Sequence, residues 1–292
     1  REYAHILSAI GWIHFRQRDL HTAQIHLQQA FDLIKPLGKD YDEAQILNRL
    51  GGVFWMQDDL VQARQYVEQS LQASQRSDDL IGQARSLTNL SILASNADIL
   101  SESIEYGLQS LEIQERIGNV REIAMCCINV GWSLHIDGQY QRAAAYFEQA
   151  LEKSIQIDDT YHQMRSLSNY GRTLIELAEY ERARTYLDQS LLICQKLNLE
   201  QDQFDIYIGL AELELGRNQI KRAEEEYQRA DALEKQPDSE EVARLQRLQA
   251  RICIARNDAE TARTLLVGSE ALFRKLNKIT EARLTRTMIS AL

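Results

Sequence analysis

The sequence predicts an all-α solenoid made of seven copies of one antiparallel helix pair, followed by a terminal helix. Two observations carry this prediction: apolar residues recur at helical spacing, and three rows of small residues repeat about every 40 positions with fixed offsets. The first row is Gly11, Gly51, Ser91, Gly131, Gly171, Ala211 and Ala250. The second is Ala23, Ala63, Ser103, Ala143, Ala183, Ala223 and Ala262, and the third is Ala30, Ser70, Ser110, Ala150, Ser190, Ala230 and Ser269.

The second unit shows how one copy is built. Residues 42–56 place apolar or small side chains at every third or fourth position, which is the period of a helix. Gln57, Asp58 and Asp59 form a short polar turn, and residues 60–76 continue as a second helix. Helices joined by such a short turn lie antiparallel. The small residues mark close helix contacts, where a bulkier side chain would cost about 1–3 kcal/mol.

The same pattern divides residues 1–292 into repeats of a single domain. The expected helix pairs are 3–39, 40–79, 80–119, 120–159, 160–199, 200–236 and 237–277, and residues 278–292 form the terminal helix. The third pair carries Ser91, Ala94 and Gly107 where glycine and large apolar residues are usual, so we expect it to pack more loosely.

Composition narrows the class of protein. With 44% apolar and 26% charged residues the chain is typical of a folded protein, and no apolar run is long enough to span a membrane. The net charge of −10 argues against direct binding to nucleic acid or anionic membranes. Cys126, Cys127, Cys194 and Cys253 form no CxxC pair, which predicts buried free thiols and a cytoplasmic location. The start at Arg1 predicts a fragment of a larger protein.

Catalytic and metal-binding motifs are missing from the sequence. It contains no phosphate-binding or dinucleotide-binding glycine motif, no HExxH and no GxSxG. His21 and His26 are five residues apart and do not share a helix face as a metal-binding pair would. We therefore predict a protein that is not an enzyme and that uses no metal or cofactor.

Specific motifs recur at fixed places in the unit. They are Leu50-Gly51-x-x-Phe54 and Val130-Gly131-x-x-Leu134 in front helices, Gln139-Tyr140-Gln141-Arg142-Ala143 in a turn, and Tyr186-Leu187-Asp188-Gln189-Ser190-Leu191 in a back helix. This pattern resembles the tetratricopeptide repeat (TPR) in its longer form, over essentially the whole chain. The resemblance implies a right-handed superhelix whose front helices line a concave wall. Similar arrays occur in kinesin light chains, spindle-orientation adaptors, bacterial peptide-sensing regulators and sensor arms of ATP-dependent transcription activators.

The resemblance also implies which side chains face that wall. The candidate binding residues are Arg49, Asn89, Asn129 and Asn169, then Arg85 and Arg165, then Trp12, Trp132 and Arg172, and finally Trp55. An asparagine amide both donates and accepts hydrogen bonds, which suits a peptide backbone. Arginine binds carboxylates with two parallel hydrogen bonds, and tryptophan anchors apolar groups.

Structural roles for the same residues stay open. The asparagines could bond a neighbouring helix, the arginines could pair with acids across units, and Trp12 and Trp132 could be packing residues. The acidic segments 224–226 and 238–241 are interpreted as solvated surface and a helix start.

The sequence therefore predicts a non-catalytic scaffold within a larger, bacterial-type signalling or regulatory protein. It would bind a protein or an extended peptide, with acidic groups, in the concave groove, and neither nucleic acid nor membrane. One alternative is a sensor arm that binds a small inducer or peptide signal to control an attached ATPase or transcription activator. Another is a purely structural spacer or self-assembly module. The ligand, its polarity, the flanking domains, the oligomeric state and the completeness of an eighth repeat are left open.

Overall fold

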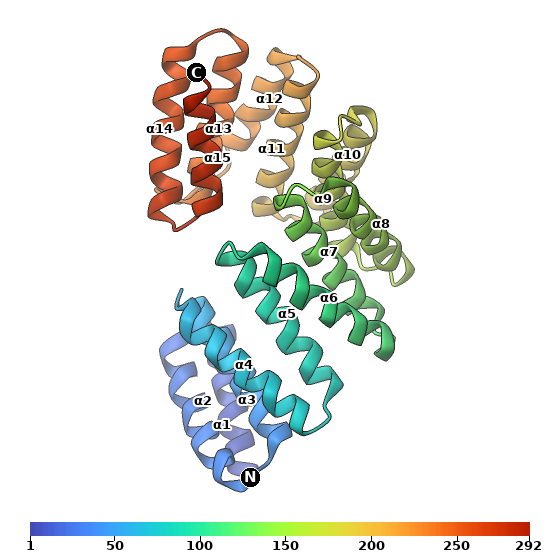
Figure 1. Cartoon of the computed structure of the whole chain (residues 1–292), viewed down its shortest axis with the longest axis vertical. Coiled ribbons are helices and arrows are strands. Elements are labelled where there is room, and N and C mark those ends of the chain that lie inside the picture. The colour runs from blue at the N-terminus through green and yellow to red at the C-terminus, as the bar shows by residue number, and fades with distance from the viewer. The chain divides into compact units, whose positions relative to one another are not determined.

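The computed structural model describes residues 1–292, which form helices and turns without any β-strand (Figure 1). The helices are α1 (Glu2–Arg16), α2 (Leu20–Ile34), the short 3-10 helix η1 (Lys35–Leu37), α3 (Asp40–Met56), α4 (Leu60–Arg76), α5 (Leu80–Asn96), α6 (Leu100–Ile117), α7 (Val120–Ile136), α8 (Tyr140–Gln156), α9 (Thr160–Glu176), α10 (Tyr180–Leu197), α11 (Glu200–Gly216), α12 (Ile220–Asp231), α13 (Glu240–Ala255), α14 (Ala259–Lys275) and α15 (Ile279–Ser290). The predicted all-α fold of helix pairs with a terminal helix is confirmed.

The chain divides into two compact units, Arg1–Val130 and Gly131–Leu292, and each is described by itself. In the first unit the front helices α1, α3 and α5 pack against the back helices α2, α4 and α6. In the second unit α9, α11 and α13 pack against α10, α12 and α14. Within each unit, successive front helices also contact one another, so they present a shared surface.

Close helix contacts explain the first row of small residues. A Cβ atom on Gly51 would lie 2.5 Å from Val67 Cγ2 and 3.2 Å from the Ala63 carbonyl oxygen. Valine is stiff at χ1, so neither neighbour can move aside easily. On the adjacent Gly52 the nearest atom would be Phe15 Cζ at 3.8 Å, an ordinary contact. The 40-residue row is therefore set by packing at one position of the helix.

The third pair does not pack loosely, contrary to expectation. The Ser91 hydroxyl donates to the Ser103 carbonyl oxygen at 2.7 Å, and the Ser103 hydroxyl donates back to the Ser91 carbonyl oxygen at 2.8 Å. Within the same pair, a Cβ atom on Gly107 would lie 3.2 Å from the Ser91 hydroxyl oxygen. The two serine hydroxyls therefore join the helices at the position where other pairs place a glycine beside an alanine.

The turns follow a second, shorter period. A residue with positive φ recurs at intervals of 20 residues, with one interval of 19: Arg18, Gly38, Asp58, Asp78, Asp98, Gly118, Gly138, Asp158, Ala178, Asn198, Asn218, Asp238, Asn257 and Asn277. Glycine, asparagine and aspartate tolerate the left-handed region best, and only Arg18 and Ala178 depart from them. Most helices therefore end one or two residues before a residue suited to reversing the chain.

The cysteines and the apolar residues occupy the interior. Cys126, Cys127 and Cys194 are buried free thiols, as predicted, and Cys253 is half-buried. Phe147 and Phe273 are among the fully buried side chains of the second unit. None of the helices combines the length and apolar character needed to cross a membrane.

Candidate functional site

A cavity of about 280 Å³ opens on the front helices of the second unit. It is lined by Trp132 from α7, by Met164, Arg165, Ser168, Asn169 and Arg172 from α9, by Asp202, Asp205 and Ile206 from α11, and by Glu240 and Arg244 from α13. Four of these side chains, those of Trp132, Arg165, Asn169 and Arg172, are binding residues predicted from the sequence.

Helix α9 supplies the polar wall of the cavity. Arg165, Asn169 and Arg172 are spaced four and three residues apart, which places them on one face of the helix. The Arg165 guanidinium lies over the Tyr161 ring, 5.9 Å from its centre. Neither arginine has a carboxylate within 4.0 Å, and the Asn169 side chain makes no hydrogen bond within the chain. These groups remain free to bind a ligand.

Arg172 is held over a stack of rings. Its guanidinium carbon lies 4.9 Å from the centre of the Trp132 ring, and Trp132 stacks on His135 with ring centres 5.2 Å apart. Burial lowers the pKa of Arg172, and the positive charge of Arg244 lowers it further. The Arg172 Nε atom is buried and has no hydrogen-bond partner. A buried donor without an acceptor is unfavourable, which points to an acceptor brought by a ligand.

His135 supports this stack as a neutral ring. Its Nδ1 atom lies 3.0 Å from the Thr173 hydroxyl, whose only proton is donated to the Asn169 carbonyl oxygen at 2.9 Å. His135 Nδ1 must therefore carry a proton and donate it to Thr173. Burial lowers the pKa of His135 to about 4, and the charge of Arg172 acts in the same direction. At neutral pH the ring fixes Trp132 and Arg172 without adding charge.

The sixth and seventh pairs add charged residues that the sequence analysis missed. Arg244 donates to Asp205 at 2.5 Å, and Arg251 donates to Glu212 at 3.0 Å. Burial alone would raise the pKa of Asp205, but the charges of Arg244 and Arg172 hold it below its ordinary value. The signal was present in the sequence. Asp205 and Arg244 continue the row of Arg165, six positions before the small residue, and Glu212 and Arg251 continue the row of Arg172.

These rows decide between the alternatives for the arginines. Along each row the charge alternates from α9 to α11 to α13, and the residue on α11 pairs with the residue on α13. Ion pairing with acids of the preceding repeat therefore accounts for Arg244 and Arg251. It leaves one unpaired arginine in each row, and both lie on α9.

The predicted residues of the first unit have more partners within the protein. The Arg49 guanidinium donates to the Ser8 carbonyl oxygen at 2.9 Å and to its hydroxyl at 2.7 Å, and it lies over the Trp12 ring. The Asn89 amide donates to the Asn48 side-chain oxygen at 3.1 Å. A cleft of about 140 Å³ beside Arg49 also holds the buried Asp42. Here the structural alternative, bonding to a neighbouring helix, accounts for Arg49 and Asn89.

The remaining predicted residues are spread over both units. Arg85 is exposed on α5, and Trp12 and Trp55 are 38% and 40% exposed on α1 and α3. Asn129 is half-buried on the part of α7 that belongs to the first unit. A single asparagine ladder that crosses from Asn89 to Asn169 therefore stays a prediction.

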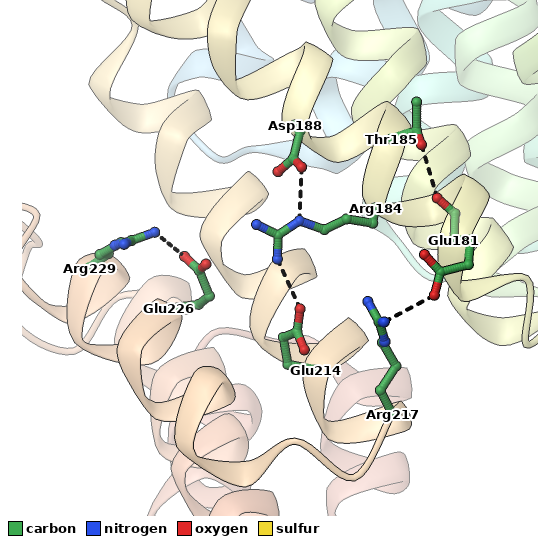
Figure 2. A network of polar contacts seen from close by, with 8 residues as sticks. All are labelled: Glu181, Arg184, Thr185, Asp188, Glu214, Arg217, Glu226 and Arg229. Carbon is green, nitrogen blue, oxygen red and sulfur yellow. Dashed lines mark hydrogen bonds and ion pairs between the residues drawn. The ribbon is translucent and has the colours of Figure 1, made fainter.

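A second group of charges lies on the back helices and the ends of the front helices (Figure 2). Arg184 on α10 donates to Asp188 at 2.8 Å and to Glu214 on α11 at 2.9 Å. Arg229 donates to Glu226 at 2.9 Å, both on α12. Each of these three acids has an arginine partner within the protein. These ion pairs therefore stabilise the packing of repeats, and they leave fewer free charges for a ligand than the cavity does. No set of three His, Cys, Asp or Glu side chains is placed to hold a metal ion.

Comparison with protein families gives two matches. Two sequence profiles described as tetratricopeptide repeat match the chain, one at residues 123–157 and 164–201 and the other at residues 8–78. No curated protein matches the chain in sequence.

Solved structures resemble the fold at low identity. The apo form of RapI superposes with a TM-score of 0.74 at 16% identity, covering 95% of this chain and 100% of that one. The Rap conjugation gene regulator of plasmid pLS20, in complex with the Phr* peptide, gives 0.68 at 15% identity, covering 96% and 76%. A signal transduction ATPase with numerous domains (STAND) from Pyrococcus horikoshii, which has a tetratricopeptide repeat sensor, gives 0.65 at 16% identity, covering 95% of this chain and 44% of that one.

Proposed function

The chain belongs to the tetratricopeptide-repeat family, and on this premise we propose that it is a non-catalytic scaffold that binds a peptide or an extended protein segment on its front helices. Repeats of this family generally serve as scaffolds rather than as catalysts. We place the protein in the cytoplasm, as a module of a larger bacterial-type signalling or regulatory protein.

The cavity on α9, α11 and α13 carries this proposal. It joins an amide without hydrogen bonds, Asn169, to two arginines without carboxylate partners, Arg165 and Arg172, beside the ring of Trp132. An asparagine amide can bond a peptide backbone through its N–H and its carbonyl together. The arginines would bind carboxylates of the partner, and Trp132 offers an apolar face.

Selection from a random peptide library displayed on phage tests the proposal. The unaltered protein should enrich a set of related peptides, and synthetic versions should bind in isothermal titration calorimetry. Asn169→Ala and Arg172→Gln should each weaken binding about tenfold or more, because each removes one or two hydrogen bonds to the peptide.

Arg222→Gln on α12 provides the matched control, because it removes the same charge from an exposed position of a back helix. It should leave the affinity unchanged. Peptides that bind equally well to the Asn169 and Arg172 variants would place the binding surface elsewhere and contradict the proposal.

A second candidate function has one supporting observation. The similarity to the repeat sensor of the STAND protein favours a sensor arm, in which a small inducer or a peptide signal controls an attached ATPase or transcription-activator domain. Both candidates use the same front helices. They differ in whether the ligand changes the activity of a domain attached to the repeats, which an activity assay of the longer protein would measure.

A further inference from the structure

The cavity continues into an acidic cleft at the N-terminal ends of α11 and α13. This second hollow, of about 370 Å³, shares Asp202, Asp205, Glu240 and Arg244 with the cavity and adds Glu241. The α9 end of the combined cleft is therefore basic, and the end between α11 and α13 is acidic.

Two charges without an ion pair, those of Asp202 and Arg172, lie at different levels of the cleft. Asp205 pairs with Arg244 at 2.5 Å, and Glu240 pairs with Lys278 at 3.4 Å. Asp202 forms no ion pair within 4.0 Å. Burial and the charge of Asp205 raise its pKa, and the nearby charge of Arg165 offsets part of that rise. At the other end, Arg172 presents a buried Nε atom without an acceptor, and on the α13 side Arg244 Nη2 is also buried without one.

Repeat register gives the separation of the two ends. Asp202 precedes Glu212 by ten residues on α11, and Glu212 occupies the repeat position of Arg172. At 1.5 Å per residue of helix, the two levels are about 15 Å apart. An extended peptide covers about 15 Å in four to five residues, at roughly 3.4 Å each. A single amino acid is too short to reach both ends.

We propose that the cleft selects a dipolar peptide segment, with a basic group bound at Asp202 and a carboxylate bound at Arg172 about 15 Å away. This inference rests on the proposed function and narrows its ligand. The sequence predicts a protein or extended-peptide partner with acidic groups, and Asp202, which forms no ion pair, adds a site for a basic group to that prediction. The basic group is a lysine or arginine side chain or a free amino end, and the carboxylate is an acidic side chain or a free carboxyl end.

Double-mutant cycles on one enriched peptide test the inference. The peptide is titrated with its basic group present or replaced by alanine, against the unaltered protein and Asp202→Asn. Each single change should weaken binding about tenfold, and the two together should cost no more than one of them, because both remove the same charge pair. Replacing the acidic group should couple to Arg172→Gln in the same way, and not to Asp202→Asn.

Two further variants separate binding from helix stability. Asp202 lies in the first turn of α11, where acidic residues stabilise a helix start. Glu200→Gln removes another acid from that turn and should leave the affinity for the peptide unchanged. Asp202→Glu keeps the carboxylate and should retain most of the affinity that Asp202→Asn loses. Circular dichroism melts of each variant show whether the fold is kept. Peptides with acetylated and amidated ends show whether the charged groups are side chains or chain ends, and either result agrees with the inference.

The two proposals fail in different ways. Enriched peptides that depend on Asn169 but lack a basic group, or whose basic group does not couple to Asp202, would overturn the dipolar inference alone. If no peptide is enriched over the starting library, the proposed function fails and the inference fails with it.

Discussion

At the scale of single residues, the sixth helix pair departs from the others in its core. Three positions after the small residues, the first two pairs place rings that stack: His14 on His26, and Phe54 on Tyr66 with centres 5.1 Å apart. The sixth pair has Glu214 and Glu226 at these positions, with exposures of 0% and 5%. Arginine partners compensate much of the burial, because Arg184 bonds Glu214 and Arg229 bonds Glu226 (Figure 2). The core of this pair is therefore polar and sensitive to charge.

Glu226→Gln should stabilise the protein at neutral pH. Burial raises the pKa of Glu226 above its ordinary value of 4.5, and Arg229 and Arg184 offset only part of the rise. The folded state therefore binds this proton more readily than the unfolded state, so stability falls as pH rises from 4.5 through the raised pKa. Glutamine keeps an acceptor for Arg229 without the charge. The variant should melt higher than the unaltered protein at pH 7.5, and the difference should shrink towards pH 5.

Exposed Glu225 on the same helix provides the control, since Glu225→Gln removes an equal charge and should shift the melting temperature less. A variant of Glu226 that melts lower at pH 7.5 would mean that the ion pair with Arg229 outweighs the cost of burial.

At the scale of helices and turns, the period of the sequence predicted nearly the whole architecture. Small residues such as Gly51 and Gly171 are required by close contacts, so their spacing reports helix packing directly. The prediction that the third pair packs loosely was wrong. Serine hydroxyls form hydrogen bonds across a helix contact for which the sequence pattern alone indicates no strong interaction. The candidate site was predicted in part, since the pattern gave Arg165, Asn169 and Arg172. Pairing between side chains on different helices depends on distances that a single sequence does not contain.

The turns after α7 and α9 give a matched test of backbone strain. Gly138 and Ala178 occupy the same place in consecutive repeats, with φ of 77° and 59°. An alanine in the left-handed region destabilises the folded state by roughly 1–2 kcal/mol. A glycine avoids this cost, but it also makes the unfolded chain more flexible, which cancels part of the gain. Ala178→Gly should therefore raise the free energy of unfolding by up to about 1 kcal/mol, and Gly138→Ala should lower it by about 1 kcal/mol, as measured by urea denaturation.

Nothing lies within 4 Å of a Cβ atom placed on Gly138, so a clash cannot explain the expected loss. If both substitutions destabilise the protein, the left-handed turn does not limit its stability.

At the scale of the whole chain, contacts within each unit join a helix mainly to its neighbours and to the next front helix. Stability in such an array is a sum of local terms, so an array opens by regions rather than all at once. Phe273 is fully buried among Ala243, Leu272 and Ala282, which lie on α13, α14 and α15. Its contribution should therefore be confined to the end of the second unit.

Phe273→Ala should cost about 3–5 kcal/mol locally. Hydrogen exchange followed by mass spectrometry should show amides of α13, α14 and α15 exchanging about a hundredfold faster or more, while α9 and α10 keep their rates. Leu187→Ala is the reciprocal control, because Leu187 packs with Met164, Ile206 and Leu210 on α9 and α11. It should speed exchange in α9, α10 and α11 and spare α14. Equal acceleration throughout Gly131–Leu292 in both variants would show that the second unit unfolds as one cooperative block. In that case the binding cleft on α9 would unfold whenever α15 does.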